Sequence, residues 1–597
     1  MSVGRLLGLN AFHGDSSAAL LDHGRFLAGV EEERLNRVKH WAGFPVAAAR
    51  QVLDDAGWRL DDLEAVTISR DPSAHLLDKV LFAFRKRPSL DAVRSRLSNQ
   101  MKVTGIEDRL AKLDRGKFRG KVYNVEHHMA HLGSTFFCSP FDEAACLTVD
   151  AFGDFLSSMS AVGRGNRLSV VDHVAFPHSL GIFYSAVTQF LGFPKYGDEY
   201  KVMGLASYGE PEFLGQLRQV VKLGENGEFE TDPDFFLHAS VGVTMSWDDG
   251  EPVVGPLWSE KLRDLLGPER AAGSDLTDRH RNIAASLQAM YEEAFFHRLR
   301  WLRKKTGLKA LCLAGGCAMN SVANGKIFRQ TDFTDVYIQS AAGDAGTALG
   351  SALYLWHQVL GNPRGFVMEH SYWGPEYPEA RVLSALKTAL PALDGDPGPV
   401  GVRAGEFVVA RHVDERTLCR ETAEAIAAGE IVGWYQGRSE WGPRALGNRS
   451  IVVDPRRAEM KDVLNARIKR REPFRPFAPS ILEERTGDYF EESYPDPFMI
   501  KVYPIRPEKR AEIPAVTHVD GTGRLQTVSK AQNPRYWALI KAFDDLTGVP
   551  VVLNTSFNEN EPMVNTPEEA LACFLRTKMH RLVMGNWVVK RTDSSPF

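Results

Sequence analysis

The chain has 597 residues, more than a single hydrophobic core normally holds, so we expect two or more domains. Hydrophobic residues make up 44% and charged residues 25%, proportions typical of a soluble globular protein. The formal net charge of -4 argues against a protein whose main ligand is a polyanion, because phosphate contacts need a surplus of lysine and arginine. No nucleic-acid partner is therefore expected.

The cysteines and the N-terminus indicate a cytoplasmic protein. The six cysteines include no C-x-x-C pair, so free buried thiols in a reducing compartment are expected instead of a zinc ribbon or a disulfide framework. The N-terminal sequence MSVGRLLGLNAFHGD lacks the uncharged apolar region of a signal peptide. No stretch approaches the roughly 20 apolar residues of a membrane span, so no membrane partner is expected.

A short pattern of strands and turns occurs twice in the first part of the chain. Strands are predicted over Arg5–Leu9, Ser17–Leu21 and Arg25–Val30, with a polar loop between the first two and a tight turn between the last two. Ala144–Asp150 and Ser157–Val162 repeat the arrangement, and in both copies an acid or a histidine lies in the first loop. The repetition predicts the duplicated α/β architecture of actin, hexokinase and acetate kinase.

Helices and strands alternate further along. A long helix is predicted over Asp275–Lys304, and strands over Lys309–Leu313 and Asp335–Gln339 each run into a glycine loop. A helix from Thr347 follows the second loop. Open α/β sheets bring backbone N–H groups towards a ligand with this sequence of strand, glycine turn and helix.

A cluster of prolines and glycines predicts the domain organisation. Residues 366–400 have the composition of an inter-domain linker. We therefore expect a first domain over residues 1–365 and a second, α/β domain over residues 401–597.

Two histidines and two aspartates form a candidate metal site. His127 and His131 lie at i and i+4 of a predicted helix, about 6 Å apart on one face. Asp150 ends an apolar strand and Asp344 lies in a glycine loop after another, where strand ends converge in this architecture. Such ligands suit iron(II), manganese or magnesium, with zinc as an alternative. Alternatively, the histidines are spaced by chance on a solvated helix, and Asp344 only caps the next helix.

His13, in the first loop, is a candidate general base, because a hydroxyl nucleophile must lose its proton and histidine titrates near neutral pH. The alternative is an incidental loop histidine. The charged segments Glu31–Arg34 and Arg37–His40 could simply be a solvated helix face.

The second domain contains several segments in which arginine is flanked by glycine, proline and phenylalanine. Arginines held in this way are suited to bidentate phosphate binding, and nearby Asn and Ser can add neutral hydrogen bonds. RNA binding would use the same residue types, but the negative net charge and the lack of an RNA-binding motif disfavour it. The segments are Gly437–Ser450, Lys469–Ser480, Val516–Arg524 and Asn554–Asn558.

Eight motifs in order over essentially the whole chain resemble those of the carbamoyltransferase family, which includes the tobramycin, cephamycin and nodulation-factor enzymes. The resemblance implies an actin-like first domain similar to the tRNA threonylcarbamoyl transferase, and a second domain similar to threonylcarbamoyl-adenylate synthase. The motifs are EHHMAH, KYGDEYKVMGLASYG, GGCAMN, GDAGTALG, GPRALGNRS, EPFRPFAPS, HVDGTGRLQTV and NTSFN.

The resemblance also implies roles for single residues. His127, His131, Asp150 and Asp344 would hold the metal, which is iron(II) in relatives, and His13 would be the general base. Relatives often read aromatic-His-Asp in this loop, whereas here Gly14 separates His13 from Asp15. Lys39 would contact carbamoyl adenylate, and Arg449 is a weaker phosphate candidate. The residues matching positions that bind carbamoyl phosphate and ATP, the latter with Mg²⁺, are Arg444, Lys469, Arg475, Arg524, Asn554 and Ser556.

The function implied is an ATP-dependent O-carbamoyltransferase. It would make carbamoyl adenylate from carbamoyl phosphate and ATP, and transfer the carbamoyl group to a hydroxyl of a small-molecule natural product, as in antibiotic biosynthesis. A homodimer is compatible with the resemblance. The alternatives are an ATP phosphotransferase of the same fold, a tRNA threonylcarbamoyl-type transferase and a non-catalytic binding protein. The acceptor cannot be read from the sequence, although Arg70–Gly120 resembles a helical insertion that could reach it.

Overall fold

A computed structural model shows two compact units, Met1–Met368 and Glu369–Phe597. The range 366–400, expected to be a linker, contains helix α15 (Glu379–Ala389), which packs against α20 (Pro567–Arg576) of the second unit. This helix forms because Val382 and Leu386 bury the same face in the core of that unit. The structure describes residues 4–79, 82, 105–240, 245–246, 251–391, 393, 397–398 and 400–592.

The first sheet of the first unit has the order β3-β2-β1-β4-β5. Its first three strands form an antiparallel meander, and the last two run parallel to β1. β1 is buried on both faces, which explains its apolar sequence RLLGLN. The strands are β1 (Arg5–Asn10), β2 (Ser17–Asp22), β3 (Arg25–Glu31), β4 (Ala65–Ile68) and β5 (Lys121–Asn124).

The second sheet repeats this topology, with the order β14-β13-β6-β7-β8. Again a three-strand antiparallel meander is followed by two strands parallel to its first strand. The predicted α/β fold with duplicated halves is therefore confirmed. The strands are β6 (Glu143–Gly153), β7 (Leu156–Arg164), β8 (Arg167–Ala175), β13 (Ala310–Ala314) and β14 (Asp335–Ile338).

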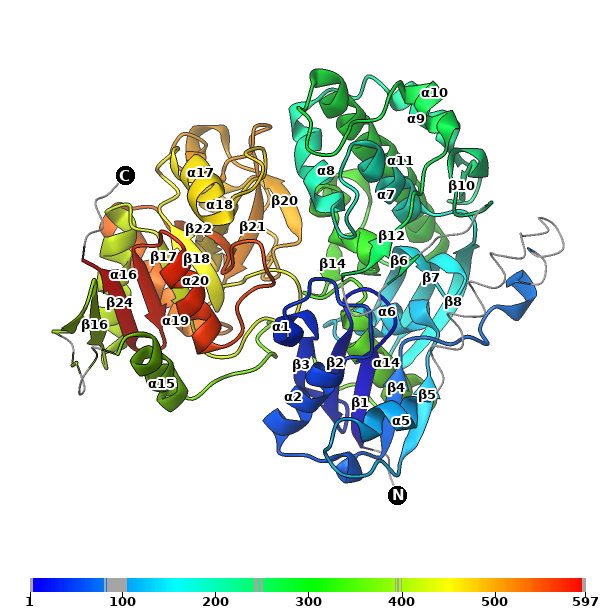
Figure 1. The fold of residues 1–597 in the computed structure, drawn as a ribbon. Coiled ribbons are helices and arrows are strands. Elements are labelled where there is room, and N and C mark those ends of the chain that lie inside the picture. Colours follow the sequence, from blue (N-terminus) through cyan, green and yellow to red (C-terminus); the bar gives the residue numbers. More distant parts are fainter. Residues whose placement is uncertain are drawn as a thin grey trace. The chain divides into compact units, whose positions relative to one another are not determined.

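Helices α6 (His127–Phe136) and α14 (Gly346–Tyr354) pack against each other between the two sheets (Figure 1). α14 packs against β1 and β2, and α6 packs against β6 and β13. The helices can approach this closely because Gly350 and Gly133 have no side chains. A methyl group on Gly350 would overlap the Ala130 carbonyl, and one on Gly133 would overlap the Gly350 carbonyl. This contact brings the start of α6 next to the start of α14, where the site described below is built.

The long predicted helix is α11 (Asp278–Thr306), which begins after Thr277 because a capping box forms between Thr277 and His280. The predicted insertion over Arg70–Gly120 falls largely on residues 80, 81 and 83–104, which lie outside the described residues. The other helices and strands of this unit are α1 (Glu33–Asn36), α2 (Val46–Ala56), α5 (Ile106–Ala111), α7 (Leu180–Phe190), α8 (Glu199–Leu205), α9 (Leu214–Val220), β9 (Val221–Leu223), β10 (Phe229–Thr231), β11 (Met245–Ser246), β12 (Val253–Val254), α10 (Glu260–Leu266), α12 (Ser321–Asn324) and α13 (Ile327–Gln330).

The second unit is built on a mixed sheet with the order β15-β16-β24-β23-β17-β18-β22-β19-β21-β20. Helices α16 (Glu415–Ala427) and α19 (Pro534–Thr547) pack together, and both contact the sheet. The remaining elements are β15 (Val402–Ala404), β16 (Phe407–Arg411), β17 (Val432–Tyr435), β18 (Arg449–Val453), α17 (Met460–Val463), β19 (Ala478–Leu482), α18 (Thr486–Tyr489), β20 (Lys501–Pro504), β21 (Thr522–Val528), β22 (Val551–Ser556), β23 (Arg581–Met584) and β24 (Trp587–Arg591).

Across the described part of the chain, none of the helices combines the length and the apolar character that crossing a membrane requires.

Candidate functional site

The start of helix α6 is fixed by two carboxylates. The Glu126 side chain caps the helix by accepting a hydrogen bond from Met129 N at 2.7 Å. Asp154 accepts from His127 N at 2.9 Å and from Asp71 N at 2.7 Å, which ties the helix to two other segments. His127 and His131 therefore point from a rigid helix end, as the i, i+4 spacing predicted.

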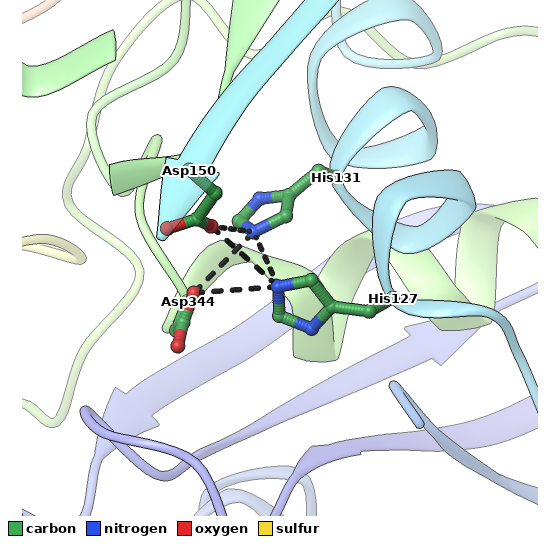
Figure 2. A group of neighbouring side chains, drawn as sticks. All are labelled: His127, His131, Asp150 and Asp344. Carbon is green, nitrogen blue, oxygen red and sulfur yellow. Dashed lines mark hydrogen bonds and ion pairs between the residues drawn. The ribbon is translucent and has the colours of Figure 1, made fainter. Parts of the chain in front are cut away.

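Two aspartates meet these histidines (Figure 2). The pairing of β6 with β7 is irregular between Val149 and Gly153, where Asp150 lies. Asp344 lies in the turn between β14 and α14. The Nε2 atoms of His127 and His131 are 3.5 and 3.0 Å from Asp150 Oδ2, and 3.7 and 3.3 Å from Asp344 Oδ1.

The geometry of this cluster fits a bound cation. Two ligand atoms about 2.1 Å from one metal and at right angles are about 3.0 Å apart, and the two histidine Nε2 atoms are separated by 3.1 Å. Asp150 is 8% exposed, so the negative charge of its carboxylate needs a positively charged neighbour. Burial lowers the pKa of His127, but Asp150 and Asp344 outweigh it and raise that pKa to about 9. These carboxylates thus create a site that attracts positive charge.

The structure does not support the alternative interpretations of these residues, a helix cap for Asp344 and a solvated helix face for the histidines. The side chain of Asp344 does not cap α14, because that helix has no side-chain cap. His127 and His131 are almost completely buried and therefore do not lie on a solvated helix face. The adjacent His128 is separate from the cluster, since its Nδ1 is hydrogen-bonded to Thr148 Oγ1 at 2.7 Å.

His13 lies against this cluster. Its ring stacks on that of His127 with the centroids 4.7 Å apart, and its Nδ1 is 3.8 Å from Asp344 Oδ2. Burial lowers the pKa of His13 to about 4, so the imidazole is neutral at pH 7 and its ring nitrogen can accept a proton.

Gly14 lies between His13 and Asp15, which make contacts in different places. Gly14 packs against Tyr196, where any side chain would overlap the Tyr196 ring. Asp15 turns away from His13 and accepts from His40 Nδ1 at 2.8 Å. Although burial lowers the pKa of His40, Asp15 outweighs it and raises that pKa to about 9. The loop therefore places the histidine at the cluster and the aspartate elsewhere.

The charged run that follows is not a solvated face. Glu31, Glu32 and Arg34 are each 4% exposed. The Glu32 carboxylate accepts from Ala47 N at 3.1 Å and Ala48 N at 2.7 Å, at the start of α2. Lys39 lies near Glu33 and His40, whose titration it influences. The run therefore anchors the start of α2.

The predicted phosphate-binding residues of the second unit come together around β21 and β22. Asn554 donates to the Ala445 carbonyl at 3.1 Å, which places it next to Arg444. Lys469 Nζ donates to the Ser556 carbonyl and to Asn558 Oδ1, the latter at 2.7 Å. Lys469 is thus buried against the end of β22, where Ser556 lies.

Arg524 lies within the influence of three other arginines of this unit. Its burial, followed by the charges of Arg444, Arg471 and Arg475, lowers its pKa. Among the described residues, its buried Nε has no hydrogen-bond partner. Asp496, an acid whose charge acts on Arg524, already accepts from Ile500 N and Lys501 N. Guanidinium groups gathered in this way favour binding of an anion, although Glu472 already lies 3.6 Å from Arg475.

Arg449 has a different role. Its guanidinium is fully buried and donates to backbone carbonyls, including those of Gln436 at 2.5 Å and Gly437 at 3.0 Å. It also lies over the Tyr435 ring, 3.8 Å from the centroid. Arg449 therefore shapes the backbone of the loop that carries Arg444.

The sequence interpretation missed several residues that build the sites. One of them is Asp154, whose backbone is left-handed, with φ 46°. The adjacent Gly153 is typical of a tight turn and was a signal for this conformation in the sequence. A side chain on Gly153 would overlap the His127 ring. Arg471 stands in the charged motif that was noted, but no role was assigned to it.

Two family models match this chain. Residues 5–353 match the family model described as Carbamoyltransferase N-terminus, and residues 423–591 match that described as Carbamoyltransferase C-terminus. The chain therefore belongs to the carbamoyltransferase family.

Individual relatives extend the comparison. The chain is 38% identical to Nodulation protein NolNO of Sinorhizobium fredii, over 98% of this chain and 80% of the relative. It is 35% identical to Nodulation protein U of Bradyrhizobium diazoefficiens, over 93% and 92%. It is also 35% identical to the 3'-hydroxymethylcephem-O-carbamoyltransferase of Amycolatopsis lactamdurans, over 46% and 48%. Among solved structures, T. kodakarensis HypF matches with a TM-score of 0.31 and 14% identity, over 60% and 48%.

Proposed function

We propose that this protein is an ATP-dependent O-carbamoyltransferase that divides its reaction between two sites. The second unit makes carbamoyl adenylate from carbamoyl phosphate and ATP, and the first unit transfers the carbamoyl group to a hydroxyl of a small molecule. The observation that carries the proposal is that one chain holds both a His–Asp cluster and a separate arginine cluster. The family membership and the cephem O-carbamoyltransferase relative support it.

In the second unit the chemistry is the breaking and forming of phosphate bonds. Carbamoyl phosphate and water give carbamate and inorganic phosphate, and carbamate then attacks the α-phosphorus of ATP to give carbamoyl adenylate and pyrophosphate. Arg444, Arg475 and Arg524 offset the charge of the phosphates and of both leaving groups. Asn554 contributes its Oδ1 as an acceptor for the carbamoyl amide, because its Nδ2 already donates to the Ala445 carbonyl and to Gln526 Oε1. Ser556 contributes a neutral hydrogen bond to the same ligands.

In the first unit the acceptor hydroxyl attacks the carbonyl carbon of the adenylate, and AMP leaves. His13 takes the hydroxyl proton, which its neutral imidazole can accept at pH 7. Lys39, in the segment that follows α1, contacts the negatively charged adenylate. Burial of the cluster keeps water away from a hydrolysable intermediate.

His127, His131, Asp150 and Asp344 would hold a divalent metal in this site. Two imidazoles and two carboxylates suit iron(II), the metal of related carbamoyltransferases, and also manganese or magnesium. When bound, such an ion acts as a Lewis acid that makes AMP a better leaving group.

The geometry of this site predicts the effect of one small change. Gly153→Ala should weaken binding of a divalent cation at least about tenfold, because the new methyl group displaces His127. The measurement is a titration of the purified protein with Mn²⁺ or, anaerobically, with Fe²⁺. Gly215→Ala is the matched control, since a methyl group there meets no neighbour. Equal affinity in the two variants would contradict the assignment of the four ligands.

The proposed activity is tested by incubating the protein with carbamoyl phosphate, ATP and a panel of hydroxylated natural products. We expect one member of the panel to gain the mass of one carbamoyl group, dependent on both ATP and carbamoyl phosphate. A gain of one phosphoryl group would instead show the alternative phosphotransferase. Labelling of tRNA with threonine and carbonate would show the threonylcarbamoyl-type activity.

A further inference from the structure

The arginine cluster of the second unit contains a residue to which neither the motif comparison nor the proposed mechanism gives a role. Arg471 lies two residues after Lys469, on the segment that continues to Arg475. Its charge acts on Lys469 and on Arg524, the same two groups on which the charge of Arg475 acts. Arg471 therefore stands in the same electrostatic neighbourhood as Arg475.

The side chain of Arg471 is held in a defined orientation. Its Nε donates to Asn465 Oδ1 at 2.8 Å, and its guanidinium lies over the Phe477 ring, 4.8 Å from the centroid. Phe477 is itself 2% exposed, so the platform is rigid. A planar guanidinium held in place by a hydrogen bond and by ring packing is preorganised to bind an oxyanion.

Asn465 links this arginine to the next one. It is 2% exposed, and its Nδ2 donates to the Arg475 carbonyl at 3.3 Å while its Oδ1 accepts from Arg471. The backbone N of Arg471 also donates to the Asn465 carbonyl at 3.2 Å. One buried amide thus sets the positions of two neighbouring arginines.

We propose that Arg471 is a phosphate-binding residue of the activating site and that Asn465 is its positioning residue. The proposal rests on the proposed function for the identity of the phosphate, which belongs either to carbamoyl phosphate or to ATP. The binding of an oxyanion itself depends only on the cluster of Arg444, Arg475, Arg524 and Lys469 around this residue.

The test replaces Arg471 with methionine, which keeps the packing on Phe477 and removes the charge. The KM for carbamoyl phosphate or for ATP, measured by pyrophosphate release, should rise at least about tenfold, the effect of losing one charge-assisted hydrogen bond. The substrate whose KM rises identifies the phosphate that Arg471 contacts. Arg471→Lys, which keeps the charge but loses the planar fork, should show a smaller rise.

Arg470→Met is the matched control. Arg470 is the adjacent residue, its side chain is 64% exposed, and it pairs with Glu559 at 3.1 Å. Both KM values should stay within about twofold of wild type. Arg471→Gln replaces the methionine variant if thermal melting shows that the latter is unfolded.

A second measurement does not depend on activity. Calorimetric titration of the full-length protein with pyrophosphate should give a Kd raised at least about tenfold in Arg471→Met and unchanged in Arg470→Met. If the two variants bind pyrophosphate equally and have equal KM values, Arg471 is structural and the inference is wrong. If wild type binds pyrophosphate through Arg471 but releases none from ATP, only the proposed function fails.

Discussion

Asp344→Ala is expected to reduce carbamoyl transfer at least about a hundredfold and to leave pyrophosphate release intact. The carboxylate contributes one of four donor groups to the candidate metal site and lies 3.7 and 3.3 Å from the two histidine nitrogens. Without it, the bound cation is lost and His13 loses its acidic neighbour. Transfer is measured by mass spectrometry of the acceptor, and activation by a coupled pyrophosphate assay in the same reaction.

His13→Gln separates the base from the metal. This variant should lose transfer by about 10²–10⁴-fold, the usual contribution of a general base, but keep the metal content of wild type. Metal content is measured by elemental analysis of the purified proteins. If Asp344→Ala retains its metal and its transfer activity, the site in the first unit is wrongly assigned.

Arg524→Met is expected to have the opposite effect, with pyrophosphate release lowered at least about a hundredfold. Arg524 is partly buried, and the positive charges of Arg444, Arg471 and Arg475 act on it, which favours binding of an anion there. The metal content should not change, because the four candidate ligands belong to the first unit. The readout is the rate of pyrophosphate formation with carbamoyl phosphate and ATP.

The control for this variant is Arg420→Met. Arg420 lies on α16, its side chain is 58% exposed, and it pairs with Glu424 one turn away at 2.9 Å. Such surface pairs contribute little, so the variant should have wild-type rates. Equal rates in Arg524→Met and Arg420→Met would contradict activation in the second unit.

Much of the fold was predictable because the two halves of the first unit repeat one pattern of strands. The structure begins β1, β2 and β3 at the predicted residues, and the topology of the second half confirms the duplication. The ends of elements were less predictable. β22 (Val551–Ser556) continues through the polar residues Asn554 and Ser556, because both pair with β18. Polar residues therefore continue a strand when a neighbouring strand satisfies their backbone.

The four metal-site candidates were found by spacing and by their position at strand ends. The sequence could not show what presses them together, because close packing of Gly133 against Gly350 and of Gly153 against His127 is a property of the folded chain. It also could not distinguish Arg449, whose two Nη atoms donate to backbone carbonyls, from the arginines proposed to bind phosphate. Distances between side chains decide such roles, and a one-dimensional motif does not contain them.

The charged segment after β3 illustrates the same limit. Read as a sequence, EEER predicts a solvated helix face, but Glu32 is buried and binds two backbone N–H groups of α2. Burial of a carboxylate is tolerated when its oxygens are satisfied in this way. Only the fold shows that the partner lies fifteen residues further along the chain.

The central claim is that ATP is cleaved to AMP and pyrophosphate in order to activate a carbamoyl group. Phosphorus NMR of wild-type protein with ATP, Mg²⁺ and carbamoyl phosphate tests it most directly, because each phosphorus product has its own resonance. We predict that pyrophosphate and inorganic phosphate form only when carbamoyl phosphate is present, and that AMP accumulates when an acceptor is added. Formation of ADP as the sole nucleotide product, without pyrophosphate, would contradict the claim and show a phosphotransferase.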